Sequence, residues 1–170
     1  PEPQGTPVEI ATDKCLSAAK QVFHQRPSTV RAVIVEDTSL CYHAMGGLPG
    51  PYIRWFLEKI GPSGLWKMLS AFEDKTGEAS CTMAVCIDGG KSVAAIFEGV
   101  CQGTIVAPRG NGHFGWDPIF EPIEQQLSGG SSKQTFAEMD PNFKNTISHR
   151  RRALNGFRAW LINNKDTLMK

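Results

Sequence analysis

Residues 32–38 read Ala-Val-Ile-Val-Glu-Asp-Thr, and this stretch decides the class of fold. Its four apolar residues do not alternate with polar ones, which is typical of a strand covered on both faces inside an α/β sheet. Two carboxylates and a hydroxyl follow at the carboxyl end of that strand. Because open α/β sheets bind ligands at this end of their strands, Glu36, Asp37 and Thr38 are candidates for a ligand site.

The segments around this stretch predict helices and further strands. Thr6, Pro7 and Glu9 predict a helix start with a capping box, and apolar residues at helical spacing extend the helix to about Phe23. Later segments add expected helices over 51–59, from 61–64 to about 71 and over 148–164, and expected strands over 77–87, 91–99 and 102–107, with a hairpin turn at 88–90. This order predicts one mixed α/β domain over residues 1–170.

The composition excludes several classes of protein. The 170 residues carry a net charge of +1, with 21% charged and 41% hydrophobic residues, as in an ordinary soluble domain. No apolar run is long enough for a transmembrane helix, so we expect no membrane partner. Five cysteines without a C-x-x-C pair argue against a disulfide framework or a zinc site and favour a reducing, intracellular compartment.

The residues alone leave two explanations open for each candidate ligand site. Glu36 and Asp37 attract a hard cation such as Mg²⁺, or they are solvated turn residues. The turn at 114–118, Phe-Gly-Trp-Asp-Pro, could hold a flat base between aromatic ring and carboxylate, or it packs into the core. Residues 144–158 contain five Lys/Arg, one His and no acid; they could neutralise phosphate, or they form a solvated helix face.

Five stretches, taken together in their order and spacing, match one known family. They are residues 1–5 (PEPQG), 35–40 (VEDTSL), 46–53 (GGLPGPYI), 114–118 (FGWDP) and 148–150 (SHR). The series resembles the inosine triphosphate pyrophosphatase family, also called the non-canonical purine NTP pyrophosphatases, from residue 1 to about residue 160. The stretches at 55–59 (WFLEK) and 72–75 (FEDK) are similar to its eukaryotic branch.

The resemblance implies a fold and an activity. The implied fold is α/β, a long mixed β-sheet flanked by helices in two lobes with a central nucleotide cleft. The implied reaction is hydrolysis of ITP, dITP and XTP to the monophosphate and pyrophosphate, with Mg²⁺ as cofactor and Mn²⁺ as a substitute. The resemblance also implies a cytoplasmic homodimer that clears deaminated purine nucleotides and has no stable nucleic-acid partner.

The resemblance assigns roles to particular residues. Asp37 would be the catalytic residue, both metal ligand and general base, and Glu2 would be the second metal ligand. The substrate contacts that the resemblance implies are Lys14, Thr38, Phe114, Gly115, Trp116, Asp117, Lys144, His149 and Arg150.

The chain departs from the family pattern in two places. The family's opening strand and its [ST]-G-N-x-x-K phosphate loop would lie upstream of Pro1. We therefore expect the first strand to be missing and the chain as printed to be a poor enzyme, because that loop supplies backbone N–H groups to the phosphates. The loop at 123–133 looks longer than its family counterpart.

Three alternatives stay open on the sequence alone. One is a related pyrophosphatase with another base preference, and another is a folded but inactive fragment. The third is a nucleic-acid-binding module that uses residues 144–158, against which the balanced net charge argues.

Overall fold

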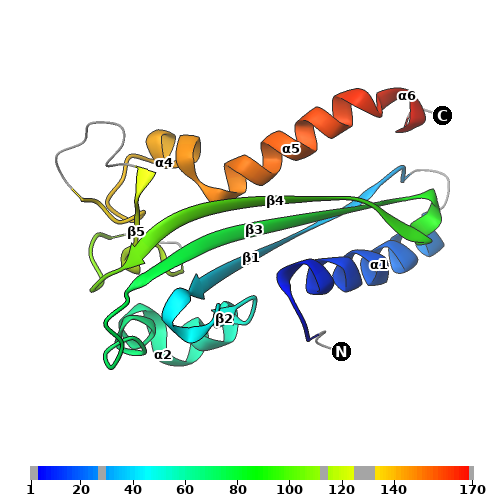
Figure 1. The fold of residues 1–170 in the computed structure, drawn as a ribbon. Coiled ribbons are helices and arrows are strands. Elements are labelled where there is room, and N and C mark those ends of the chain that lie inside the picture. Colours follow the sequence, from blue (N-terminus) through cyan, green and yellow to red (C-terminus); the bar gives the residue numbers. More distant parts are fainter. Residues whose placement is uncertain (1–3, 27–29, 112–114, 125–132, 169–170) are drawn as a thin grey trace.

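The computed structural model describes residues 4–26, 30–111, 115–124 and 133–168. Figure 1 shows a long twisted sheet with α1 on one side and α5 on the other. In chain order the elements are α1 (Pro7–Gln25), β1 (Val33–Tyr42), η1 (His43–Met45), β2 (Pro49–Gly50), α2 (Ile53–Lys67), β3 (Thr76–Ile87), η2 (Asp88–Gly90), β4 (Ser92–Ile105), η3 (Asp117–Ile119), β5 (Phe120–Pro122), α4 (Pro141–Ile147), α5 (His149–Asn163) and α6 (Lys165–Leu168).

The sheet has the strand order β2-β1-β3-β4-β5. The expected α/β architecture with flanking helices is confirmed, and each pairing between the described strands is antiparallel. The turn at η2, with Gly89 and Gly90 at positive φ, joins β3 to β4 where the hairpin was expected. The connection has only four residues, 88–91, and so short a connection requires its strands to run antiparallel.

The capping box predicted at the start of α1 is confirmed. Thr6 Oγ1 accepts a hydrogen bond from the Glu9 amide at 3.3 Å, and Glu9 Oε2 accepts one from the Thr6 amide at 2.8 Å, which completes the capping box of α1. The two helices expected between residues 51 and 71 form α2, which is interrupted at Gly61 (φ 63°, ψ 179°). Ser148 caps α5 by accepting from the Arg151 amide at 3.3 Å.

Three expectations about the strands are wrong. Glu36, Asp37 and Thr38 do not follow the carboxyl end of a strand but lie in the middle of β1, which continues to Tyr42. Residues 32–35 are not covered on both faces: Val33 and Val35 pack against α1, but Ile34 is 43% exposed, because α5 packs mainly against β3 and β4. The expected strands at 91–99 and 102–107 are one continuous strand, β4. The glycine at position 99 does not mark the end of a strand. It lies inside β4, where the absence of a side chain makes room for the backbone of α5.

The core divides into clusters on the two faces of the sheet. Small side chains, including those of Ala11, Cys15 and Cys86, join α1 to β3. Larger ones, including Leu40, Tyr42 and Leu65, fill the space between the sheet and α2, and Met83, Ala153 and Phe157 pack beneath α5.

Four of the five cysteines are buried and behave as small hydrophobes, and Cys41 is partly exposed. All five are free thiols, as expected from their spacing, and burial raises the pKa of Cys15 to about 12. No helix in the described part of the chain is long and apolar enough to span a bilayer.

Candidate active site

Strand β1 presents its acidic residues to opposite faces of the sheet, because successive side chains of a strand alternate. Asp37 is paired in register with Thr82 and points to the α1 side, where Lys14 Nζ lies 3.1 Å from Asp37 Oδ1. The other oxygen, Oδ2, is buried and has no hydrogen-bond partner among the described residues. An unpartnered buried carboxylate oxygen is costly, so this atom is suited to receive a cation or a donor from a ligand.

Glu36 and Thr38 face the other side, toward α5. Arg150 Nε donates to Glu36 Oε1 at 2.7 Å, and Arg150 Nη2 lies 3.5 Å from Thr38 Oγ1. The first turn of α5 lies directly on the sheet, since a Cβ added to Gly99 would lie 2.1 Å from the His149 carbonyl oxygen. A glycine inside a strand often marks such a close backbone approach. Gly99 therefore allows Arg150 to reach β1.

The turn that contains Gly115 and Trp116 packs against the same region. Gly115 has a positive φ of 38°, and the buried Trp116 ring lies 5.7 Å from that of Phe120 and 5.5 Å from that of His149. The sequence left core packing and ligand binding open for this turn. The structure shows that the Trp116 ring belongs to the core cluster while the residue also lines a pocket.

The buried Asp117 and the partly buried Lys144 form an ion pair beside this turn. Lys144 Nζ donates to Asp117 Oδ2, and Asp117 Oδ1 is buried without a partner in the described part of the chain. Burial raises the pKa of the Asp117 carboxyl, while the hydrogen bond from Lys144 opposes that rise. The pair thus places a positive and a negative group at fixed positions next to the aromatic turn.

His149 is buried between cationic and aromatic neighbours. Burial, together with the charges of Arg150 and Lys144, lowers its pKa to about 3, so the imidazole is neutral at physiological pH. Neither ring nitrogen has a hydrogen-bond partner among the residues described. A neutral imidazole offers one donor and one acceptor, which suits it to contact a heterocyclic base.

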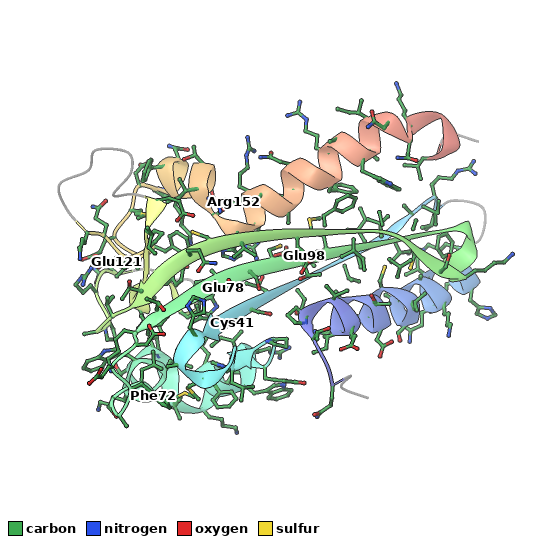
Figure 2. The ribbon with its side chains drawn as sticks, in the orientation of Figure 1. Cys41, Phe72, Glu78, Glu98, Glu121 and Arg152 are labelled. Carbon is green, nitrogen blue, oxygen red and sulfur yellow. The ribbon has the colours of Figure 1, made fainter. Side chains whose placement is uncertain are left out.

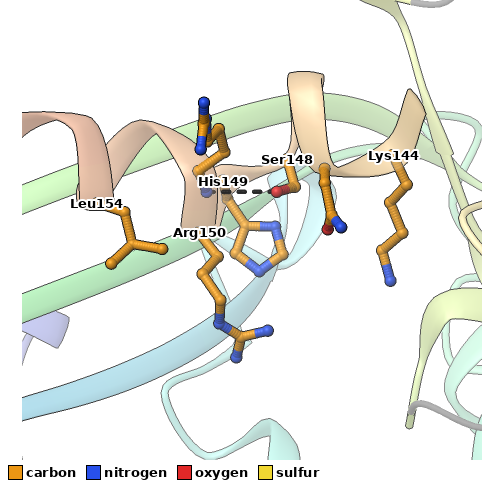
Figure 3. A pocket seen from close by; sticks show the side chains of 7 residues that line it. Lys144, Ser148, His149, Arg150 and Leu154 are labelled. Atoms are coloured by element: carbon orange, nitrogen blue, oxygen red, sulfur yellow. Dashed lines mark hydrogen bonds between the residues drawn. The ribbon is translucent and has the colours of Figure 1, made fainter. Parts of the chain in front are cut away.

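These groups meet in two adjoining pockets that share Arg150. The first has a volume of about 390 Å³ and is lined by Glu36, Asp37, Thr38, Ile53, Arg54, Leu57, Gly115, Trp116 and Arg150. The second, shown in Figure 3, has a volume of about 330 Å³ and is lined by Lys144, Asn145, Ser148, His149, Arg150, Arg151 and Leu154. In Figure 3 the Arg150 side chain extends from α5 toward the strands.

A larger hollow lies elsewhere on the sheet and is not the better candidate. It has a volume of about 690 Å³ and is bordered by Cys41, Glu78 and Glu98, which Figure 2 labels. None of the residues that line it is a predicted site residue, and no buried unpartnered polar atom of the described chain belongs to its lining. Volume alone therefore does not locate the site.

Comparison with known proteins places these residues in a family. The model of the Ham1 family matches residues 1–160. The chain belongs to the Ham1 family. This confirms the resemblance to the inosine triphosphate pyrophosphatases.

Three solved structures share the fold. A HAM1 protein from Coxiella burnetii is 29% identical with a TM-score of 0.79, and the match covers 96% of this chain and 80% of that one. The Staphylococcus aureus Ham1 protein is 26% identical with a TM-score of 0.75 over the same shares. A protein from Mycobacterium abscessus described as a nucleoside-triphosphatase and dITP/XTP pyrophosphatase is 25% identical with a TM-score of 0.64, covering 91% of this chain and 78% of that one.

In this Ham1-family chain the structure brings most of the predicted site residues together. One pocket contains Asp37, Thr38, Gly115, Trp116 and Arg150; Lys144 and His149 line the adjoining pocket; Lys14 contacts Asp37, and Asp117 contacts Lys144. Glu2, Phe114 and most of the loop at 123–133 lie outside the described residues. The roles of all these residues stay predictions.

Sequence reasoning missed the contribution of α2 to the first pocket. Ile53 and Leu57 are one helical turn apart, so both face the pocket, and Arg54 lines it beside them. The i, i+4 spacing of the two apolar residues was a usable signal for a buried helix face. Nothing in the spacing of Arg54 distinguished it from an ordinary surface residue.

Proposed function

We propose that this Ham1-family chain hydrolyses ITP, dITP and XTP to the nucleoside monophosphate and pyrophosphate. The observation that carries the proposal is one pocket in which the Asp37 carboxylate, the Gly115–Trp116 turn and Arg150 meet. The pocket combines a group for phosphate chemistry with an aromatic turn and a donor for a base. The family and the described activity of the Mycobacterium abscessus relative support the same class of substrate.

The donor set fits a hard divalent cation. Asp37 Oδ2 is a buried carboxylate oxygen without a partner in the described chain, and carboxylate oxygens are preferred ligands of Mg²⁺. We infer that Asp37, together with Glu2, would hold Mg²⁺, for which Mn²⁺ would substitute. When bound, the ion supplies positive charge that neutralises the triphosphate. Among the described residues no group of three or more His, Cys, Asp or Glu could hold a metal.

Asp37 and Lys14 would act on the reacting phosphates. Asp37 accepts a proton from the water that attacks the α-phosphorus. A new P–O bond forms to that water oxygen, the bond between the α-phosphorus and the bridging oxygen breaks, and pyrophosphate leaves. Lys14, 3.1 Å from Asp37 in the free chain and 40% exposed, is placed to transfer its contact to a phosphate oxygen.

Arg150 and His149 would select the base. Inosine and xanthine carry an oxo acceptor at purine position 6, whereas adenine carries an amino donor there. An arginine offers donors only, so a donor directed at the base pairs with the oxo group of inosine or xanthine and faces another donor in adenine. Sites built on polar pairing can discriminate by about 10⁴-fold.

Pairing within the basic segment 144–158 argues against a nucleic-acid-binding module. Lys144, Arg150 and Arg152 each form an ion pair with a carboxylate, on Asp117, Glu36 and Glu124 respectively. Their charges are thus compensated inside the molecule, which reduces the basic surface available to a phosphate backbone. The family further leads us to propose a cytoplasmic homodimer.

A substrate panel tests the proposal and its alternatives. The chain is incubated with Mg²⁺ and ITP, XTP, ATP, GTP, dUTP or TTP, and pyrophosphate release is measured. We expect ITP and XTP to be turned over in preference to ATP, and Arg150→Ala to narrow the ITP-to-ATP ratio of kcat/KM. Faster turnover of dUTP or TTP than of ITP and XTP would show another base specificity. No turnover with any of them, and a salt-dependent shift with single-stranded DNA, would contradict the proposal.

A further inference from the structure

One oxygen of Glu36 accepts hydrogen bonds from three different side chains. Oε1 lies 2.7 Å from Arg150 Nε, 3.2 Å from Thr38 Oγ1 and 3.5 Å from Cys81 Sγ. Two of these donors stand on the sheet in paired positions, Thr38 on β1 and Cys81 on β3. Arg150 alone comes from a helix. The carboxylate therefore connects α5 to a rigid part of the sheet.

We propose that Glu36 is a positioning residue that fixes the direction of the Arg150 guanidinium and thereby sets the preference for 6-oxo purines. The inference rests on the proposed function, in which Arg150 pairs with the base. It gives Glu36 a role different from that of its neighbour Asp37, because the two side chains leave β1 on opposite faces.

The geometry of the guanidinium explains how one contact can fix it. Arginine reaches its polar end through several rotatable bonds, and ordering them costs conformational entropy. The guanidinium group itself is planar and rigid. Once Nε is held by Glu36, the plane and direction of both terminal nitrogens follow, and Nη2 comes to lie 3.5 Å from Thr38 Oγ1 in the wall of the pocket.

Cys81 keeps Glu36 in place from beneath. The thiol is fully buried, and burial followed by the nearby Glu36 charge raises the pKa of Cys81 to about 12. It therefore stays protonated and donates to the carboxylate rather than repelling it. Glu36 itself is an exposed residue, with 34% of its side chain open to solvent, so the anchor lies at the edge of the pocket rather than in the core.

A double-mutant cycle on base preference tests the inference. The affinities for IMP and for AMP are measured by titration calorimetry in the parent, Glu36→Ala, Arg150→Ala and the double variant. We expect Glu36→Ala to lower the IMP-to-AMP preference on the order of 10-fold, and Arg150→Ala to lower it at least as much. In the double variant the loss should equal that of Arg150→Ala alone, because Glu36 acts through Arg150.

Two further variants separate positioning from a general effect on the fold. Glu36→Gln keeps an oxygen that can accept from Arg150 Nε, so it should retain much more of the preference than Glu36→Ala. The matched control is a second ion pair between α5 and a carboxylate, Arg152 to Glu124 at 2.9 Å, which lies outside the pocket; Figure 2 labels Arg152. Glu124→Ala should leave the preference unchanged.

The outcomes distinguish this inference from the proposed function. Equal affinities of the parent chain for IMP and AMP would overturn the proposed base selection itself. Two outcomes would overturn the positioning role alone. In the first, the parent prefers IMP and Glu36→Ala keeps that preference. In the second, Glu36→Ala lowers the preference by the same factor whether or not Arg150 is present. A loss of preference in Glu124→Ala as large as that in Glu36→Ala would also overturn it.

Discussion

Lys14 Nζ lies 3.1 Å from Oδ1 of Asp37, while Oδ2 of the same carboxylate is buried with no partner in the described part of the chain. The two oxygens therefore have different environments. One is neutralised by a cation from α1, and the other is available for a ligand. This asymmetry is the structural basis for giving Asp37 both a metal-binding and a proton-accepting role.

Replacing Asp37 by asparagine should remove both roles and keep the shape. We expect Asp37→Asn to lower kcat for ITP on the order of 10²-fold or more, with the melting temperature close to that of the parent. The measurement is pyrophosphate release at saturating Mg²⁺, with circular dichroism as a check of the fold. A variant that kept near-parental kcat would deny Asp37 both roles.

Removing Lys144 should destabilise the chain through the carboxylate that it leaves behind. Lys144→Met leaves Asp117 buried and unpaired, and breaking a buried ion pair in this way costs about 3–5 kcal/mol. The double variant Lys144→Met/Asp117→Asn removes the unpaired charge and should recover part of the loss. Urea unfolding measures both free energies. If the double variant were no more stable than the single one, the unpaired charge would not be the cause.

The buried His149 should make stability depend on pH. Its pKa is lowered to about 3 in the folded chain, whereas the unfolded chain has the ordinary value near 6.5. Between these values the unfolded chain binds the additional proton, so the free energy of unfolding falls as the pH drops below about 6.5. Above that pH the effect is absent.

The matched comparison uses His149→Phe, which keeps an aromatic ring and cannot be protonated. Between about pH 6 and pH 4 the parent should lose stability more steeply than this variant, by up to about 1.4 kcal/mol per pH unit. The raised pKa of Asp117 contributes a trend of opposite sign, but both chains share it. Identical slopes in urea unfolding across this range would show that His149 is protonated equally in both states.

The sequence predicted the positions of most elements well where a local signal was strong. The capping box at Thr6 and Glu9, the break at Gly61 and the hairpin at 88–90 all form where expected, because each depends on interactions within a few residues. Gly99 was misread as a strand end. A glycine is needed there because the backbone of His149, fifty positions later in the chain, packs against it. A pattern of neighbouring residues cannot predict such a long-range contact.

The sequence predicted which residues belong to the candidate site, but it did not predict how they are arranged in space. The resemblance supplied Asp37 and Arg150, but the alternation of β1 sends Asp37 toward Lys14 and Glu36 toward Arg150. That division depends on which helix covers each face of the sheet. For the same reason the place of Arg54 in the wall contributed by α2 could not be predicted from the sequence.

The most direct test of the proposed reaction follows an oxygen atom. The chain is incubated with ITP and Mg²⁺ in ¹⁸O-labelled water, and the products are separated and analysed by mass spectrometry. The identity of the products, rather than the rate, decides the result, so slow turnover is sufficient. Attack on the α-phosphorus predicts IMP and pyrophosphate in equal amounts, with the label in IMP and with much slower product formation by Asp37→Asn. Formation of IDP and orthophosphate, or label found in pyrophosphate, would contradict it.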